Sequence, residues 1–207
     1  MQITESHCGP AVLQMLLSNV EIEVSQEAIA EAGGAASLIE LNGMRVDQLA
    51  LAVRRLAPQV RFYYKDHATI DELVRVVNDY RSPAGVEWQG EFKEEDEPVP
   101  AGPGLGVGKP ADSESEDSDY GHYSLVTQAE RRRRELIIAD PYKDYFSQAR
   151  VFTYKEFNRR WYDYNEVPDP ATGQAVLVKD DHLFFVVVRP NVFFPRWMGM
   201  KTYDLSS

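Results

Sequence analysis

The stretch Gln2-Ile3-Thr4-Glu5-Ser6-His7-Cys8-Gly9-Pro10-Ala11 contains the only cysteine of the chain and runs directly into an apolar helical pattern. Cys8 is therefore expected at the N-terminus of a helix, where unpaired backbone N–H groups and the helix dipole favour a thiolate. Pro10 agrees with this interpretation, because proline is tolerated in the first helical turn. The apolar residues that follow have the spacing of a helix packed into a core: Val12, Leu13, Met15, Leu16 and Leu17.

A cysteine nucleophile needs a base, a group that orients this base, and donors for the oxyanion. His122 stands at the start of one expected strand, and Asp140 directly follows the next, at 135–139. Two antiparallel strands joined by a short turn would bring His122 and Asp140 side by side as a base and its orienting carboxylate. Gln2 is close enough to Cys8 for its side-chain amide to donate to the same carbonyl oxygen as the Cys8 N–H.

These residues resemble the double-glycine peptidase family through Gln2, the run Cys8-Gly9-Pro10-Ala11, Gly121-His122 and Asp140-Pro141. Its members are papain-like cysteine proteases, known best as the leader-cleaving domains of bacteriocin and peptide exporters. The resemblance extends to about Trp161. It implies that Cys8 is the nucleophile, His122 the base, Asp140 the orienting group and Gln2 an oxyanion donor. It also implies a papain-like fold with the site in a groove between a helical half and a sheet half.

Other histidines compete with this assignment. His182 also precedes an apolar strand, but no following strand there ends in Asp or Asn, so we favour His122 as the base. His7 adjoins the cysteine and His67 falls in an expected turn, and neither is given a role. A lone cysteine is more often a small buried hydrophobic residue than a nucleophile, so the catalytic interpretation of Cys8 depends on the whole set of residues.

The remaining sequence predicts an α+β fold, with a helical N-terminal half packed on an antiparallel β-sheet in the C-terminal half. We expect helices at 25–32, 45–56, 69–80 and 154–161, and strands at 60–64, 82–88, 123–129, 135–139, 150–152 and 183–189. The four arginines at 131–134 suggest either an anionic partner or a solvated hairpin tip, and we favour the tip because no aromatic residues alternate with them. The aromatic tail beyond Pro190 is expected to pack across the core.

The chain has 207 residues and 43% hydrophobic content, which fits one domain over 1–207. Its formal net charge of −11 is uneven, because residues 91–119 carry ten acidic side chains and two lysines. This stretch is also rich in proline and glycine, and it cannot bury enough apolar surface to offset its chain entropy. We expect a flexible acidic insertion at about 91–119, either a solvated loop without a role or a lid or docking strip for a basic substrate segment.

Composition also bears on partners and location. The acidic charge argues against nucleic acid as a partner. No apolar run approaches about 18 residues and no signal pattern is visible, so we expect no membrane insertion and a cytoplasmic protein, with a leader removed before Met1 left open. One cysteine provides neither an internal disulfide nor a thiolate metal cluster, and we expect no metal and no cofactor.

Two functions of different classes follow. In the first, the protein is a cysteine peptidase that hydrolyses peptide or protein substrates, after small residues such as Gly-Gly, with Cys8, His122, Asp140 and Gln2 in the roles above. In the second, it is a catalytically silent domain that binds peptides in the same groove. Acyl transfer or deamidation through the same thioester is a further alternative.

Overall fold

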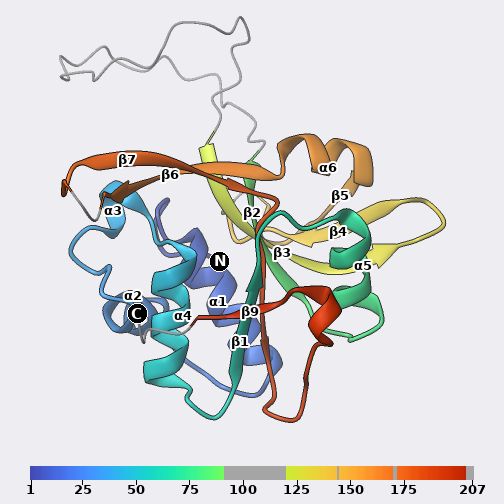
Figure 1. Ribbon diagram of the computed structural model, residues 1–207, viewed down its shortest axis with the longest axis horizontal. Coiled ribbons are helices and arrows are strands. Elements are labelled where there is room, and N and C mark those ends of the chain that lie inside the picture. The colour runs from blue at the N-terminus through green and yellow to red at the C-terminus, as the bar shows by residue number, and fades with distance from the viewer. Residues whose placement is uncertain (91–119, 144, 170–171, 204–207) are drawn as a thin grey trace, which may run out of the picture.

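The structure is a computed structural model that describes residues 1–90, 120–143, 145–169 and 172–203. Its centre is a seven-stranded sheet of order β5-β4-β3-β2-β8-β1-β9, in which neighbouring strands run antiparallel (Figure 1). The strands are β1 (Arg61–Lys65), β2 (Ala84–Gly90), β3 (Tyr120–Glu130), β4 (Glu135–Ala139), β5 (Ala149–Thr153), β8 (Phe184–Val188) and β9 (Lys201–Thr202). The helices are α1 (Cys8–Asn19), α2 (Gln26–Ala32), α3 (Ile39–Asn42), α4 (Val46–Leu56), α5 (Ile70–Asn78) and α6 (Tyr154–Arg160).

Helices cover both faces of this sheet. α1, α2 and α4 share one buried cluster with Phe185 and Val187, whereas α5 and α6 share another with Phe184 and Val186. Because successive side chains of a strand point to opposite faces, β8 contributes to both clusters. Burial on both faces explains why this strand is a continuous apolar run instead of an alternating one.

The α+β class is confirmed, and several local signals form as the sequence predicts. α1 begins at Cys8. α2 follows the N-cap Ser25, whose hydroxyl accepts a hydrogen bond from the Ala28 N–H at 3.2 Å. α5 begins after a reciprocal capping box between Thr69 and Glu72. One feature differs: β1 and β2 come from the first half of the chain yet lie inside the sheet, so the helical and sheet halves interleave.

A second antiparallel pair, β6 (Tyr162–Pro168) and β7 (Ala175–Asp181), is absent from the sequence prediction. β7 is exposed along most of its length, so it has no alternating apolar pattern that would reveal a strand. Gly173 takes a left-handed φ of 69° between the two strands. In Figure 1 the hairpin runs from α6 toward α3, across the edge of the molecule that carries the start of β3.

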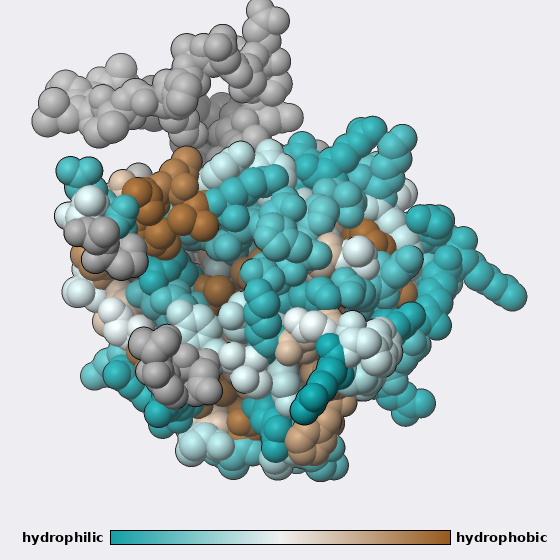
Figure 2. All heavy atoms as spheres, viewed as in Figure 1, coloured by the Kyte–Doolittle hydropathy of each residue, from teal (hydrophilic) through white to brown (hydrophobic). Residues whose placement is uncertain are grey.

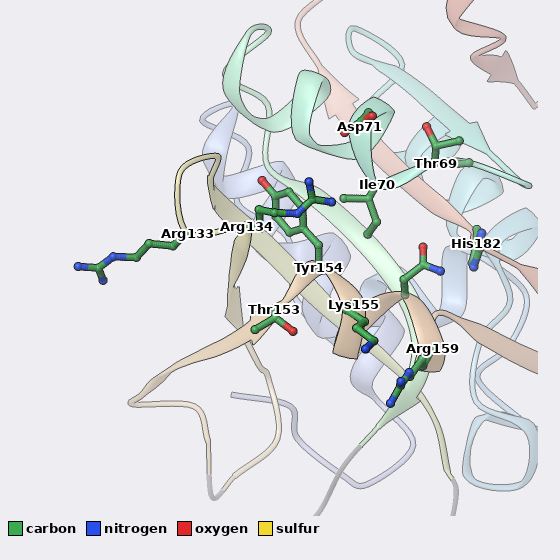
Figure 3. Close-up of a pocket in the computed structure, with 12 residues that line it drawn as sticks. Thr69, Ile70, Asp71, Arg133, Arg134, Thr153, Tyr154, Lys155, Arg159 and His182 are labelled. Carbon is green, nitrogen blue, oxygen red and sulfur yellow. The ribbon is translucent and has the colours of Figure 1, made fainter.

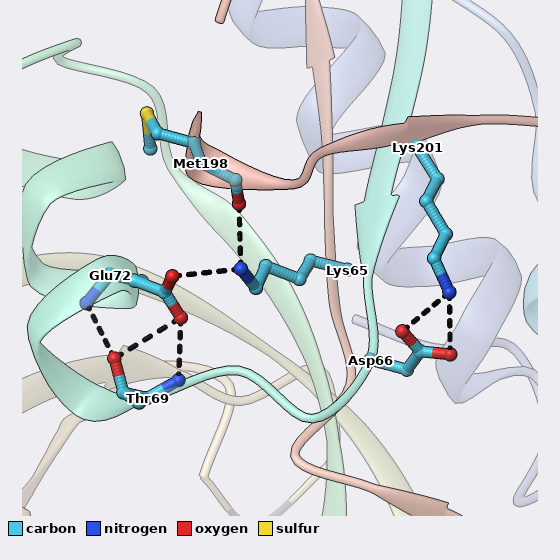
Figure 4. Close-up of polar contacts among 6 residues, drawn as sticks. All are labelled: Lys65, Asp66, Thr69, Glu72, Met198 and Lys201. Atoms are coloured by element: carbon cyan, nitrogen blue, oxygen red, sulfur yellow. Dashed lines mark hydrogen bonds and ion pairs between the residues drawn. The ribbon is translucent and has the colours of Figure 1, made fainter. Parts of the chain in front are cut away.

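The C-terminal tail packs on β1 and α5 only in part. Met198 is buried in the η1 turn (Arg196–Met198), and Phe194 packs against the same cluster, as predicted. Phe193 and Trp197 are 60% and 64% exposed, so for these two residues the prediction is wrong. Polar contacts also hold the tail. Figure 4 shows Lys65 Nζ donating to the Met198 carbonyl at 2.6 Å and to Glu72 Oε1 at 2.8 Å, beside the pair of Lys201 and Asp66.

The acidic insertion expected at about 91–119 lies outside the described residues. Within the described ranges, no helix has the length and apolar character needed to cross a membrane.

Candidate active site

Cys8 is the first residue of α1 and lies at the floor of a cavity of about 490 Å³. It is 9% exposed, and its N–H has no acceptor within the helix because it belongs to the first turn. Gly9 allows α1 to approach its neighbours, since a Cβ there would lie 3.3 Å from both the Met44 carbonyl and the Tyr123 ring. The cavity is lined by Glu5, Ser6, Cys8, Glu40, Leu41, Asn42, Gly43, Gly121, His122 and Tyr142.

His122 reaches this cavity from β3, and Asp140 approaches it from the end of β4. The two strands pair with Leu125 opposite Ala139, which places the carboxylate directly after β4 beside the imidazole. His122 Nε2 lies 2.8 Å from Asp140 Oδ1, and both residues are buried, at 4% and 1% exposure. Since Nε2 is engaged by the carboxylate, Nδ1 remains for the Cys8 thiol, with which His122 also forms a hydrogen bond.

The electrostatics favour a protonated imidazole in this pocket. Burial alone would lower the pKa of His122, but the hydrogen bonds to Asp140 and Cys8 outweigh it and raise this pKa to about 9. For Asp140, burial alone would raise the carboxyl pKa, whereas its partners, His122 first, lower it below its usual value. The carboxylate therefore stays ionised and the imidazolium is stabilised.

Arg150 on β5 completes the Asp140 site and is absent from the sequence prediction. Its Nη1 donates to Asp140 Oδ2 at 2.6 Å, while the Tyr142 N–H donates to Oδ1 at 3.0 Å. The guanidinium carbon lies 4.1 Å from the Tyr145 ring centroid and 5.0 Å from that of Phe152. Arg150 thus holds the second carboxylate oxygen, and the aromatic rings hold Arg150.

Gln2 lies close to the nucleophile segment, but its amide does not line the cavity. The amide Nε2 donates to the carbonyls of Thr4 and Glu5, each at 3.0 Å, and Oε1 is buried without a hydrogen-bond partner. The turn before α1 directs these carbonyls toward the amide. The backbone N–H of Gln2 donates to the Pro141 carbonyl at 2.9 Å, which links the Gln2 and Asp140 segments. Its role as an oxyanion donor requires rotation of the amide and stays a prediction.

The other histidines lie elsewhere. His182 stacks on Trp161 with ring centroids 5.0 Å apart and borders a different cavity from Cys8. His7 Nδ1 contacts the Thr4 hydroxyl at 2.6 Å, and His67 is exposed near Asp181. None of the three takes the place of His122 beside Cys8.

A carboxylate packs behind the start of β3. A Cβ at Gly121 would lie 2.1 Å from an Asp163 carboxylate oxygen, so the absence of a side chain next to His122 lets β6 approach. Asp163 accepts a hydrogen bond from Gln89 Nε2 at 2.8 Å. Burial first, and Asp180 as well, raise the pKa of Asp163 to about 6. In the described parts of the chain, no three His, Cys, Asp or Glu side chains are arranged to hold a metal ion.

Comparison with known proteins gives a structural neighbour but no sequence relative. The chain matches the crystal structure of the peptidase domain of Streptococcus ComA, a bi-functional ABC transporter involved in a quorum-sensing pathway. The TM-score is 0.55 at 17% identity, over 91% of this chain and 95% of that one. The chain has a papain-like fold. No family model and no curated protein sequence matches it.

The papain-like fold agrees with the expected arrangement of the site. α1 supplies the cysteine at its first residue, and the sheet supplies His122 and Asp140 from adjacent strands. The fold class predicted from the sequence is therefore confirmed, whereas the chemical roles of the residues stay predictions.

Proposed function

We propose that this protein is a cysteine peptidase. The observation that carries the proposal is the hydrogen-bonded series in which His122 contacts both the Cys8 thiol and the Asp140 carboxylate in one cavity. A nucleophile, a base and an orienting group in this order are the requirements for acyl transfer to a thiol.

The proposed reaction has two stages. The thiolate of Cys8 attacks the peptide carbonyl carbon and forms a C–S bond, while the proton resides on His122. When the tetrahedral species collapses, His122 gives this proton to the leaving amine and the C–N bond breaks. Water, which loses a proton to His122, then attacks the thioester carbonyl, the C–S bond breaks, and the carboxylic acid and the Cys8 thiolate are released. Asp140 remains ionised throughout and stabilises the imidazolium.

Oxyanion stabilisation is assigned to the Cys8 N–H and, after rotation of its amide, to Gln2. Rotation would exchange the Thr4 and Glu5 carbonyls for the developing negative charge, which is a stronger acceptor. The donor would then act mainly in the transition state, where it lowers the barrier instead of tightening substrate binding.

A groove suited to an extended peptide adjoins the nucleophile. The cavity around Cys8 shares Leu41, Asn42, Gly43 and Gly121 with a second hollow bordered by Leu38 and Tyr164. Figure 2 shows apolar surface at the upper left, where Figure 1 places β7 and α3, and the exposed apolar residues of these elements include Leu38, Leu41, Val176, Leu177 and Val178. Peptide or protein substrates would lie in this groove, and cleavage after small residues such as Gly-Gly rests on the family resemblance alone.

One observation favours a second candidate, a silent peptide-binding domain. Both amide protons of Gln2 are directed at main-chain carbonyls, so the second oxyanion donor is not in place in this structure. The same groove would serve either function.

Two measurements separate the candidates. Incubation with a peptide library should yield cleaved products by mass spectrometry with the wild type and none with Cys8→Ala. Gln2→Ala should then lower kcat by about 10²- to 10³-fold with little change in KM, the usual cost of one oxyanion donor. If the wild type cleaves nothing, and Gln2→Ala weakens peptide affinity by calorimetry in the Cys8→Ala background, the binding function replaces the peptidase.

A further inference from the structure

A second cavity, of about 730 Å³, lies where the start of α5, α6 and the β3–β4 hairpin tip meet (Figure 3). α5 and α6 belong to the buried cluster on the face of the sheet that α1 does not cover. The two cavities share no lining residue, so the peptidase reaction leaves this one unexplained.

Cations dominate its rim. Arg133, Arg134, Lys155 and Arg159 border the cavity, against one carboxylate, Asp71. In the part of the chain that the structure describes, none of these four cations has an ion pair. These four cations lie around one cavity, whereas residues 91–119 carry most of the negative charge of the chain. They create a local positive potential that attracts anions.

A neighbouring arginine that lies outside the cavity provides a contrast, because it does have a partner. Arg131 belongs to the same run of four arginines but does not line the hollow, and its Nη2 lies 2.6 Å from Asp79 Oδ1.

The wall holds a polar group that also lacks a partner. Tyr154 is 6% exposed, and its hydroxyl is buried without a hydrogen-bond partner. In Figure 3 this hydroxyl lies beside the Arg134 side chain, whose guanidinium carbon is 5.5 Å from the Tyr154 ring centroid. A buried hydroxyl without a partner costs free energy, and a ligand oxygen at this end of the cavity would satisfy it.

Two features of the backbone around the cavity are also typical of ligand sites. Arg134 and His182 both border the cavity in left-handed conformations, with φ of 56° and 52°. Residues other than glycine keep such conformations at a cost in free energy, and they concentrate at ligand sites. Ile70 and Asp71, the first two residues of the nine-residue helix α5, also line the cavity, and first-turn N–H groups of helices bind anions.

We propose that this cavity binds a ligand that carries two or more phosphate groups. Arg134 offers a planar fork at the Tyr154 end, and Lys155 and Arg159 lie four residues apart on α6 and extend together in Figure 3. Asp71 lies at the other end of the view from Lys155 and Arg159, and Arg133 points away from the remaining residues. The phosphate groups therefore contact Arg134, Lys155 and Arg159, while Ile70 and Ala68 provide apolar contacts.

Titration calorimetry of the full chain with inorganic pyrophosphate tests the proposal. Arg134→Gln and the pair Lys155→Gln with Arg159→Gln should each weaken binding by about ten-fold or more, as loss of a charge-assisted hydrogen bond does. Asp71→Asn should tighten binding, because it removes the opposing charge. Arg131→Gln is the matched control, since it removes the same charge from the same hairpin without touching the cavity. These side chains are exposed, and thermal unfolding of each variant verifies that the fold is retained.

Vesicles distinguish the source of the phosphate. Co-sedimentation with vesicles that contain a phosphoinositide with two or more phosphate groups, if it depends on Arg134, Lys155 and Arg159, would assign the site to lipid headgroups. Pyrophosphate binding without vesicle binding assigns it to free phosphate compounds. The proposal is overturned if neither probe binds, or if Arg131→Gln weakens binding as much as Arg134→Gln.

Discussion

Arg150 and Asp140 form a 2.6 Å ion pair on the carboxylate oxygen that His122 does not use. The Asp140 side chain is fully buried and that of Arg150 is 12% exposed. With one oxygen fixed by each partner, the plane of the carboxylate is set, and through it the orientation of the imidazole. Arg150 is thus a positioning residue that acts on the base through Asp140.

Replacement of Arg150 tests this role. Arg150→Met should lower kcat/KM by about 10²-fold, because small displacements of a base cost that much. It should also lower the free energy of unfolding by roughly 3 kcal/mol, since it leaves a buried carboxylate with one partner fewer. The alkaline limb of the pH–rate profile should move to higher pH, because loss of a nearby cation raises the pKa of His122. Steady-state kinetics across pH and urea denaturation measure the three effects.

Arg150→Lys is the matched variant, because it keeps the charge and loses the planar fork. In Arg150→Lys the alkaline limb should lie at the same pH as in the wild type, whereas kcat/KM should recover only in part. A purely structural role would instead show as lowered stability in Arg150→Met with an unchanged pH profile.

The choice of base is testable by comparing two histidines. His122→Ala should abolish turnover, because His122 is the one described histidine that lines the Cys8 cavity. His182→Ala should retain most of the activity, since its ring stacks on Trp161 and borders the other cavity. Peptide cleavage assays on both variants, with circular dichroism to verify folding, make the comparison. Activity that survives His122→Ala and disappears with His182→Ala would assign the base to His182.

The raised pKa of His122 has consequences for activity and for stability. Because this pKa is about 9, the imidazolium needed to protonate the leaving amine should persist until the pH approaches 9. The unfolded value is about 6.5, so the stabilisation is complete below that pH and is lost as the pH rises from about 6.5 through 9. NMR titration of the imidazole should give a lower pKa in Cys8→Ala, since the thiol contributes to the shift. An unchanged value in that variant would show that Cys8 and His122 do not interact.

The pairing of His122 with Asp140 could be predicted because it is local. A single short turn joins β3 to β4, so register and proximity follow from about twenty residues of sequence. The expected position of Cys8 likewise depended on one helix start. Both inferences used signals that lie within a few residues of the groups concerned.

Arg150 could not be predicted because its role depends on two strand pairings at once. β5 must pair with β4 so that Arg150 stands opposite Ile138, and its aromatic neighbours come from both β5 and the preceding turn. β6 and β7 were missed for a related reason, since carboxylates and amides dock β6 on the sheet in place of an apolar stripe. Sequence periodicity reports apolar burial and is silent on such contacts.

The last prediction concerns Glu87, a buried acid on β2 that contacts the β6–β7 hairpin. It is 1% exposed, its Oε1 accepts a hydrogen bond from Asn165 Nδ2 at 3.1 Å, and its Oε2 has no hydrogen-bond partner. Burial first, then Asp163 and Asp180, raise its pKa well above the usual value. A raised carboxyl pKa means that the folded state holds a proton that the unfolded state has released, so stability falls as the pH rises above about 4.3.

Glu87→Gln removes this titration while retaining the shape and the acceptor for Asn165. The variant should therefore gain stability relative to the wild type between pH 5 and pH 8, by about 1 kcal/mol or more, since each pKa unit corresponds to about 1.4 kcal/mol. Urea denaturation of both proteins at the two pH values measures the difference. Glu31→Gln, at an exposed position on α2, is the control and should change the free energy of unfolding by the same amount at pH 5 and at pH 8. If Glu87→Gln also changes the free energy of unfolding by the same amount at both pH values, Glu87 is ionised in the folded protein. The β6–β7 hairpin is then held by a charged carboxylate.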